Sequence, residues 1–270
     1  MNTLCQHLAG ESLSDALMRF EAEIKARPAD ADLRAAFVQF LTLSGNWMRA
    51  LTQLKSWLAL KQQAKPTVTL LEQSIKGELQ RAQVMAGQAR PVMPETQWPW
   101  LTTLAAALNE TGERALALRL DALEQAQATA GQITSENGET QAFAWLMDGD
   151  ARLGPVCEAI VNGRYFWLPF NAIAGIRFLT PVSVTDLVWR HALVHLTDGT
   201  EQVCQIPVRY PFTADASDAV KLARTTEWLP LNNDGTLYEG MGQKAWLSEQ
   251  SESPLLSLNQ VTFAADGAHE

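Results

Sequence analysis

The spacing of apolar residues changes near residue 142, and this change restricts the possible folds more than any other feature of the sequence. Before it, apolar residues recur every three or four positions, which is the period of an α-helix. After it, short runs rich in Val, Ile and aromatic residues are separated by Asn-Gly and Asp-Gly pairs, which favour β-hairpins. At 270 residues the chain is long enough for two domains. The sequence therefore predicts an α+β protein, with a helical domain over residues 1–139 and a mostly antiparallel, β-rich domain over residues 140–270.

The first predicted helix has a continuous apolar stripe. Ser14 is its expected N-cap and Pro28 is expected to end it, because proline cannot continue a helix. The stripe consists of Leu13, Leu17, Phe20 and Ile24. Such a stripe can pack in the core, and at the end of a chain it can also contact a partner, so both interpretations stay open.

Two further segments of the first half each predict a helix hairpin. In the first hairpin, Gly45 is expected to take the left-handed conformation of a helix C-cap, and Trp47 is expected to pack at the start of the next helix. The second hairpin breaks at Gly112. Both glycines are followed by Arg-Ala-Leu, which begins at Arg49 and at Arg114. Because such hairpins recur in tetratricopeptide arrays, the helical half is predicted to be tetratricopeptide-like, with one more amphipathic helix over residues 67–87.

The second half is predicted to form hairpins and one short helix, the latter over residues 216–225. The predicted turns lie at Asn162-Gly163, Asp198-Gly199 and Asp234-Gly235. Residues 136–139 are predicted to be the hinge between the halves.

A charged cluster lies shortly after this predicted hinge. Asp148, Asp150 and Glu158 could bind a divalent cation, but their spacing does not match a calcium loop, so a charged hinge is favoured. Gly154 and Pro155, which lie within the cluster, are assigned structural roles.

The sequence does not contain a complete catalytic or metal-binding motif. His191 and His195 have the spacing of a zinc pair on a helix, but they fall in a predicted strand, and Ala192 stands where an HExxH motif requires Glu. A packing or surface role is therefore favoured, and a metal-dependent hydrolase that uses these histidines is the alternative. Cys157 lies between apolar neighbours and is interpreted as a small buried side chain. We expect neither a cofactor nor a bound metal.

The composition disfavours several classes of function. With 21 basic and 30 acidic residues the net charge is −9, so binding to nucleic acid or to an anionic membrane is not expected. No stretch is apolar enough to span a membrane, and the N-terminus lacks the pattern of a signal peptide. The cysteines, Cys5, Cys157 and Cys204, are far apart and are expected to be reduced thiols. A cytoplasmic protein is predicted.

Several of these segments together resemble the ImpE/SciE family, also called TagJ, whose members are accessory proteins of bacterial type VI secretion systems. The resemblance depends on the hairpin Asp32–Leu51, the block Arg152–Val156 and the aromatic run Tyr165–Pro169. It implies a cytoplasmic adaptor and not an enzyme. It also implies contacts with the small subunit of the contractile sheath and, in some systems, with the AAA+ ATPase that recycles contracted sheaths.

We expect the partners to bind the helical half. The apolar stripe that begins at Leu13 is the expected contact for the ATPase, and the groove of the stacked hairpins is the expected site for the sheath subunit. Trp47 and Arg49 are further candidates for partner contacts.

Overall fold

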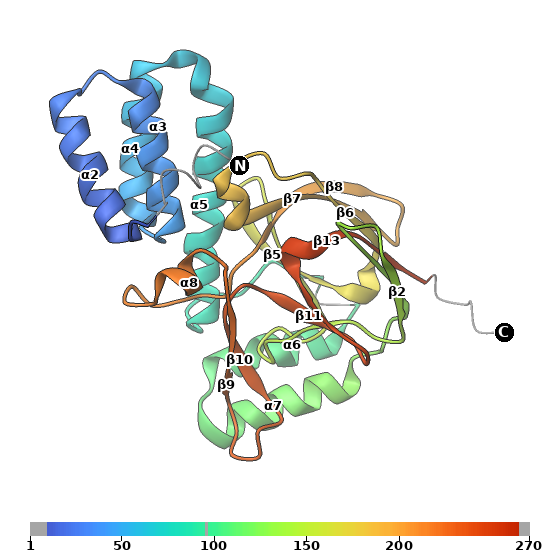
Figure 1. Cartoon of the computed structure of the whole chain (residues 1–270). Coiled ribbons are helices and arrows are strands. Elements are labelled where there is room, and N and C mark those ends of the chain that lie inside the picture. Colours follow the sequence, from blue (N-terminus) through green and yellow to red (C-terminus); the bar gives the residue numbers. More distant parts are fainter. Residues whose placement is uncertain (1–9, 95–96, 265–270) are drawn as a thin grey trace.

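The structure is a computed structural model that describes residues 10–94 and 97–264. Helices come first and strands follow, with one short helix among the strands, so the predicted α+β organisation is confirmed (Figure 1). The α-helices are α2 (Leu13–Ala26), α3 (Ala31–Leu43), α4 (Trp47–Leu60), α5 (Lys65–Met85), α6 (Pro99–Ala106), α7 (Gly112–Gln125) and α8 (Asp218–Lys221). Short 3₁₀ helices lie at Gln62–Ala64, Ala107–Asn109, Phe170–Ala172, Val184–Leu187 and Leu255–Ser257.

The start of α2 differs by two residues from the predicted N-cap. Ser12 is extended, and its Oγ accepts a hydrogen bond from the backbone N–H of Asp15 at 3.1 Å. Ser14 already lies inside the helix, so its prediction as the N-cap is wrong.

The apolar stripe of α2 packs onto α3. Leu13 and Phe20 are buried, and the ring centroid of Phe20 lies 4.8 Å from that of Phe40. Leu17 and Ile24 are half-buried against the same core. These side chains therefore hold α2 on the helical layer.

The first predicted hairpin is present as α3 and α4. Gly45 has a φ of +72°, which confirms the left-handed conformation, and its N–H donates to the carbonyl oxygen of Thr42 at 3.1 Å. Trp47 is the first residue of α4, and its ring centroid lies 5.7 Å from that of Trp189. Trp47 is half-buried, so part of its surface stays accessible.

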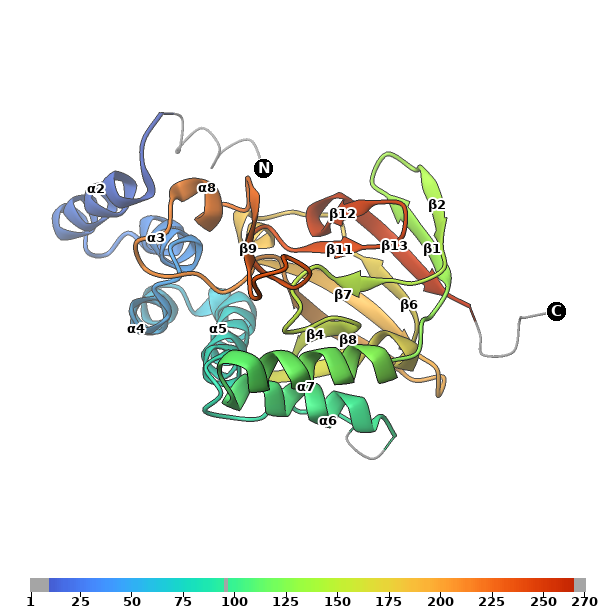
Figure 2. The same ribbon diagram turned by 90° about the horizontal axis from the view of Figure 1, so that it is seen from below.

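Helix α5 connects the helical layer to the sheet, as Figure 2 shows. It contacts α4 as well as strands of the sheet. A Cβ added at Gly77 would lie 2.4 Å from Cγ2 of Ile160, so only glycine allows the helix to approach the strand so closely. The second predicted hairpin, α6 and α7, lies below the main sheet in Figure 1 and in the foreground of Figure 2, and its turn at Gly112 is confirmed. The tetratricopeptide-like character of the helices stays a prediction.

The main sheet has eight antiparallel strands in the order β2-β1-β13-β6-β7-β8-β4-β5. Its strands are β1 (Gly131–Ser135), β2 (Thr140–Phe143), β4 (Val156–Val161), β5 (Arg164–Pro169), β6 (Ile173–Phe178), β7 (Trp189–Leu196), β8 (Glu201–Pro207) and β13 (Leu258–Phe263). Two smaller sheets accompany it. They contain β9 (Thr226–Pro230) with β10 (Tyr238–Gly242), and β3 (Met147–Asp148) with β11 (Ala245–Leu247) and β12 (Glu252–Pro254).

The predicted hairpin turns are confirmed, but the predicted hinge is wrong. The turns at Asn162-Gly163, Asp198-Gly199 and Asp234-Gly235 join β4 to β5, β7 to β8 and β9 to β10. Residues 136–139 are the turn between β1 and β2, because the sheet already begins at Gly131. The division of the chain into domains at residues 139 and 140 stays a prediction.

The helical part and the sheet share a hydrophobic core. One buried cluster extends from α2 to Ile160, Trp167 and Trp189 in the sheet. A second cluster, around Phe170 and Trp246, lies within the β-rich part. In the described part of the chain, no helix combines the length and the apolar character needed to cross a membrane.

Candidate functional site

A groove of about 660 Å³ opens between α2, the turn from α3 to α4, and the segment that follows β8. Its apolar lining consists mainly of Leu13, Leu17, Trp47, Met48, Leu79 and Phe212. Its polar lining consists of Ser14, Ser44, Asn46, Asp218 and Lys221. We call this feature the helical groove.

Two contacts hold the walls of the helical groove together. The backbone N–H of Leu13 donates to Oδ2 of Asp218 at 2.8 Å, which joins the start of α2 to α8. A Cβ at Gly45 would lie 3.1 Å from the ring of Phe212, so the glycine leaves room for that ring against the turn. The groove is thus formed by segments that lie far apart in the sequence.

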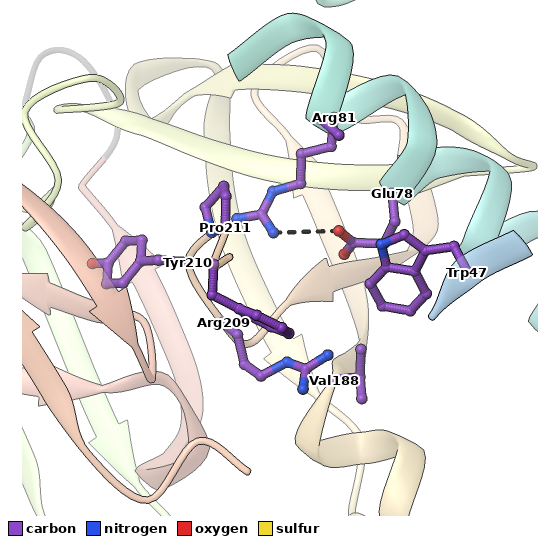
Figure 3. A pocket seen from close by; sticks show the side chains of 9 residues that line it. Trp47, Glu78, Arg81, Val188, Arg209, Tyr210 and Pro211 are labelled. Carbon is purple, nitrogen blue, oxygen red and sulfur yellow. Dashed lines mark hydrogen bonds and ion pairs between the residues drawn. The ribbon is translucent and has the colours of Figure 1, made fainter. Parts of the chain in front are cut away.

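A small cavity of about 90 Å³ lies next to the helical groove, and Trp47 and Phe212 line both. Figure 3 shows Glu78 and Arg81 entering its wall from α5, and Arg209 entering from the segment after β8. Each of these three side chains is buried. The cavity is therefore lined by charged groups that have little contact with water.

Glu158 of β4 is the centre of a buried ionic network behind this cavity. Arg81 donates to its two carboxylate oxygens, from Nε at 2.6 Å and from Nη2 at 2.8 Å. Nζ of Lys244 lies 2.7 Å from Oε2 of Glu158, and the hydroxyl of Tyr165 donates to Oε1. Burial alone would raise the pKa of Glu158, but the charges of Arg81 and Lys244 outweigh it and hold this pKa well below its ordinary value.

Asp148 extends the network on the other side of Lys244. Its Oδ2 lies 2.6 Å from Nζ of Lys244, and its Oδ1 accepts a hydrogen bond from the hydroxyl of Tyr210 at 2.8 Å. Burial raises the pKa of Asp148 to about 6, although the nearby ammonium group opposes this shift. Asp148 and Glu158 therefore respond in opposite ways to the same buried environment.

Asp150 belongs to a second ionic cluster nearby. Nε of Arg152 donates to Oδ1 of Asp150 at 2.9 Å, and Nη1 of Arg152 lies 2.7 Å from Oε1 of Glu239. With Asp148, Asp150 and Glu158 each at most 1% exposed, the interpretation of these carboxylates as a charged hinge is wrong. They can be buried because cations pair with them: Arg81 and Lys244 reach Glu158 and Asp148 from distant segments, and Arg152 pairs with Asp150 from two residues away.

Gly154 and Pro155 shape the turn between β3 and β4. Gly154 has a φ of +54°, and its carbonyl oxygen accepts a hydrogen bond from the N–H of Asp148 at 2.7 Å. A Cβ at Gly154 would lie 2.5 Å from Cδ2 of Leu123 in α7. The carbonyl oxygen of Pro155 accepts a hydrogen bond from the N–H of Phe170 at 3.0 Å. Both residues contribute hydrogen bonds or close packing that suit a structural role.

The structure brings only some of the predicted contact residues together. Leu13, Leu17 and Trp47 line the helical groove, whereas Phe20 and Ile24 do not. Arg49 points to a different neighbour: its Nη2 lies 2.5 Å from Oε1 of Glu21, and its guanidinium lies over the ring of Phe37. Arg49 therefore links α4 to α2 outside the groove.

The histidines lie on β7, as the predicted strand required, and the cysteine is buried. His191 and His195 are both half-buried, and Nδ1 of His195 lies 3.1 Å from Oε1 of Glu201. Over residues 10–94 and 97–264, no three or more His, Cys, Asp or Glu side chains are grouped as metal ligands would be. Burial raises the pKa of Cys157 well above its ordinary value, which agrees with a small buried side chain. Cys5 lies outside the described residues.

Sequence reasoning missed four charged residues of the site. They are Glu78, Arg81, Arg209 and Lys244. A signal existed for the first two, because Glu78 and Arg81 continue the face of α5 that carries Leu71 and Ile75. Charged residues on an apolar helix face indicate buried partners.

Comparisons with known proteins show similarity over the whole chain. Residues 140–262 match the family model described as "ImpE protein". The chain is 38% identical to the type VI secretion system accessory component TagJ of Pseudomonas aeruginosa over 256 residues, which is 93% of this chain and 87% of that protein. Its fold is similar to the crystal structure of protein VPA1032 from Vibrio parahaemolyticus, with a TM-score of 0.85 and 26% identity over 100% of this chain and 98% of the other. The similarities thus include the helices as well as the sheet.

Proposed function

The chain belongs to the ImpE family of type VI secretion accessory components, and we propose that it acts as a non-catalytic adaptor that binds the small subunit of the contractile sheath. The proposed place of action is the cytoplasm. The metal-dependent hydrolase considered from the sequence has no support in the grouping of the described side chains or in the names of the relatives.

The helical groove is the observation that carries this proposal. Its mixed lining of apolar and polar side chains fits an amphipathic helix, whose apolar face enters a groove while its polar face stays in water. Met48 is 65% exposed at this groove, so an apolar side chain is already available to a partner. An exposed apolar side chain next to a groove is typical of a protein-binding surface.

The buried charges also support an adaptor. Both oxygens of Glu158 are occupied by cations and by a tyrosine hydroxyl, which leaves no carboxylate oxygen for acid–base chemistry there. The raised pKa of Cys157 keeps its thiol protonated and unreactive.

The substitution Met48→Glu tests the site for the sheath subunit. We expect it to weaken binding of the purified sheath small subunit by about tenfold or more, because the bound helix would bury the new charge against apolar side chains. Calorimetric titration measures this effect. Leu120→Glu is the matched control, since Leu120 is 44% exposed on α7, away from the groove lining. Equal affinity of Met48→Glu and the wild-type protein would contradict the proposed site.

The second proposed partner is the AAA+ ATPase that recycles contracted sheaths, with α2 as its contact. Because the apolar stripe of α2 faces α3, the surface that α2 offers to the ATPase is the outward one, where Met18 is 61% exposed. Met18→Glu is expected to abolish binding to the N-terminal domain of the ATPase and to preserve binding to the sheath subunit. Leu60→Glu, at a 41% exposed position in α4, is the control in the same pull-down measurement. Retention of the ATPase by Met18→Glu would exclude this face of α2.

A further inference from the structure

Arg209 is a buried cation without an acidic partner in the described residues. Its side chain is 3% exposed and lines the cavity beside the helical groove. Its hydrogen bonds go to main-chain carbonyl oxygens, from Nη1 to Leu43 at 2.6 Å and to Lys221, and from Nη2 to Thr42 at 3.2 Å. The bonds to Thr42 and Leu43 satisfy carbonyls at the end of α3, where a cation is favourable, and the bond to Lys221 satisfies one at the end of α8.

Two N–H donors of Arg209 have no acceptor among residues 10–94 and 97–264. A guanidinium has five N–H donors, of which Nη1 holds two, Nη2 holds two and Nε holds one. The three hydrogen bonds use both donors of Nη1 and one of Nη2. The donors that remain are on Nε and Nη2, the same two nitrogens with which Arg81 binds the carboxylate of Glu158.

The surroundings of Arg209 favour a negative charge. The pKa of Arg209 is lowered to about 10, mainly by burial; the nearby charge of Glu78 opposes this shift and that of Arg81 adds to it. The carbonyl hydrogen bonds and the ring of Phe212, whose centroid lies 4.9 Å from Cζ of Arg209, replace part of the lost hydration, and a carboxylate would add the missing countercharge. The cavity of about 90 Å³ exceeds the ~10–15 Å³ that one water molecule requires, so a carboxylate group has room.

The helical groove lies next to this cavity. Trp47 and Phe212 line both the groove and the cavity, so these two rings lie where the two spaces adjoin. A side chain that reaches Arg209 from the groove would have to pass these rings.

We propose that the segment bound in the helical groove inserts an aspartate or glutamate side chain into the cavity, where its carboxylate accepts hydrogen bonds from Nε and Nη2 of Arg209. This inference rests on the proposed function, in which the helical groove holds a helix of the sheath small subunit. The apolar contacts supply affinity, and the charge pair fixes the position of the helix along the groove. A bidentate pair is suited to this role because its geometry tolerates little displacement.

A double-mutant cycle tests the pair. Arg209→Lys keeps the positive charge but removes the planar fork, and Arg90→Lys, at an exposed arginine, is the matched control. Each Asp and Glu of the sheath small subunit is replaced in turn by Asn or Gln, and the affinities are measured by calorimetry. We expect one replacement that weakens binding to the wild-type protein about tenfold or more and has little effect on binding to Arg209→Lys. Tight binding of the sheath subunit without any such coupled residue overturns the inference and leaves the proposed function intact.

A second measurement uses the unmodified chain and decides the case in which the sheath subunit does not bind. The Nε–H resonance of Arg209 is followed by NMR while acetate replaces chloride at constant ionic strength. A saturable shift of this resonance, with no shift for Arg90, supports a carboxylate site even if the proposed partner is wrong. An Arg209 resonance that does not respond to acetate overturns the carboxylate site.

Discussion

At the scale of single residues, the stability of the buried charge network depends on Glu158. Arg81 and Lys244 both donate to this one carboxylate, and the three side chains are almost completely buried. A buried ion pair adds little net stability, because its members lose their hydration on folding. Removal of one member nevertheless destabilises the folded protein strongly, because the other charges stay buried without compensation.

Glu158→Gln is therefore expected to lower the free energy of unfolding by about 3–5 kcal/mol at pH 7. Because the pKa of Glu158 is depressed in the folded state, its contribution is complete above its unfolded pKa of about 4.3 and is lost as the pH falls below that value. The difference in the free energy of unfolding between Glu158→Gln and the wild-type protein should therefore decrease as the pH falls below about 4.3. Urea unfolding at several pH values between 2 and 7 measures it, and a pH-independent difference would contradict the assigned role.

Asp148→Asn is a control. Its effect on the free energy of unfolding should change with pH in the opposite direction to that of Glu158→Gln. The folded pKa of Asp148, about 6, lies above its unfolded value, so the folded state binds more protons in between. The stability that Asp148 contributes to the wild-type protein is therefore lost as the pH rises from about 4 to about 6. The variant does not titrate there, so its stability relative to the wild-type protein should rise over this interval.

At the scale of elements, α2 is attached by few side chains, whereas α5 is fixed from two sides. The buried residues of α2 are Leu13, Ala16 and Phe20, and polar contacts join the helix to Asp218 through Leu13 and to Arg49 through Glu21. Helix α5 contacts α4, β4 and β5, and it contributes Arg81 to the buried network. Local opening should accordingly begin at α2, because segments with few buried contacts open first.

Phe20→Ala is expected to cost about 3–5 kcal/mol, because it leaves a cavity between α2 and α3. Hydrogen exchange should then show lost protection in α2 and nearly unchanged protection in α5. Met18→Ala, at an exposed position of the same helix, should leave both unchanged. Equal loss of protection in α2 and α5 would mean that the two helices open as one unit.

At the scale of the whole molecule, the shared core argues against two independent domains. The cluster that begins with Leu13 in α2 includes Ile160 and Trp167 of the sheet. Side chains of the helical part also donate into the sheet, as Ser74 does to Gln205 at 2.6 Å. Removal of either part would expose this common core to water.

We expect one cooperative unfolding transition for the whole chain. Circular dichroism, which follows the helices, and tryptophan fluorescence, which reports on both parts through side chains such as Trp57 in α4 and Trp167 in β5, should give the same midpoint. A fragment of residues 1–139 should unfold at a lower temperature than the same residues in the full chain. Two separate transitions would instead favour division of the chain at residues 139 and 140.

The sequence by itself determined the local structure of this protein. The period of three to four residues predicted α2 to α7, and the Xaa-Gly pairs predicted the hairpins, because helices and tight turns depend on residues that are close in sequence. The conformation of Gly45 was predictable for the same reason, since no other residue takes a positive φ as easily.

Only the tertiary structure decided which charged residues are buried and which segments form the helical groove. Arg81 and Glu158 are 77 positions apart, Asp148 and Lys244 are 96 apart, and Arg209 and Leu43 are 166 apart. The sequence near Asp148 contains several charged residues and turn residues, and an exposed hinge would have the same composition. A charge can be buried only where a partner replaces its lost hydration. In these pairs the partner comes from a distant part of the chain, so the sequence near the charge gives no sign of it.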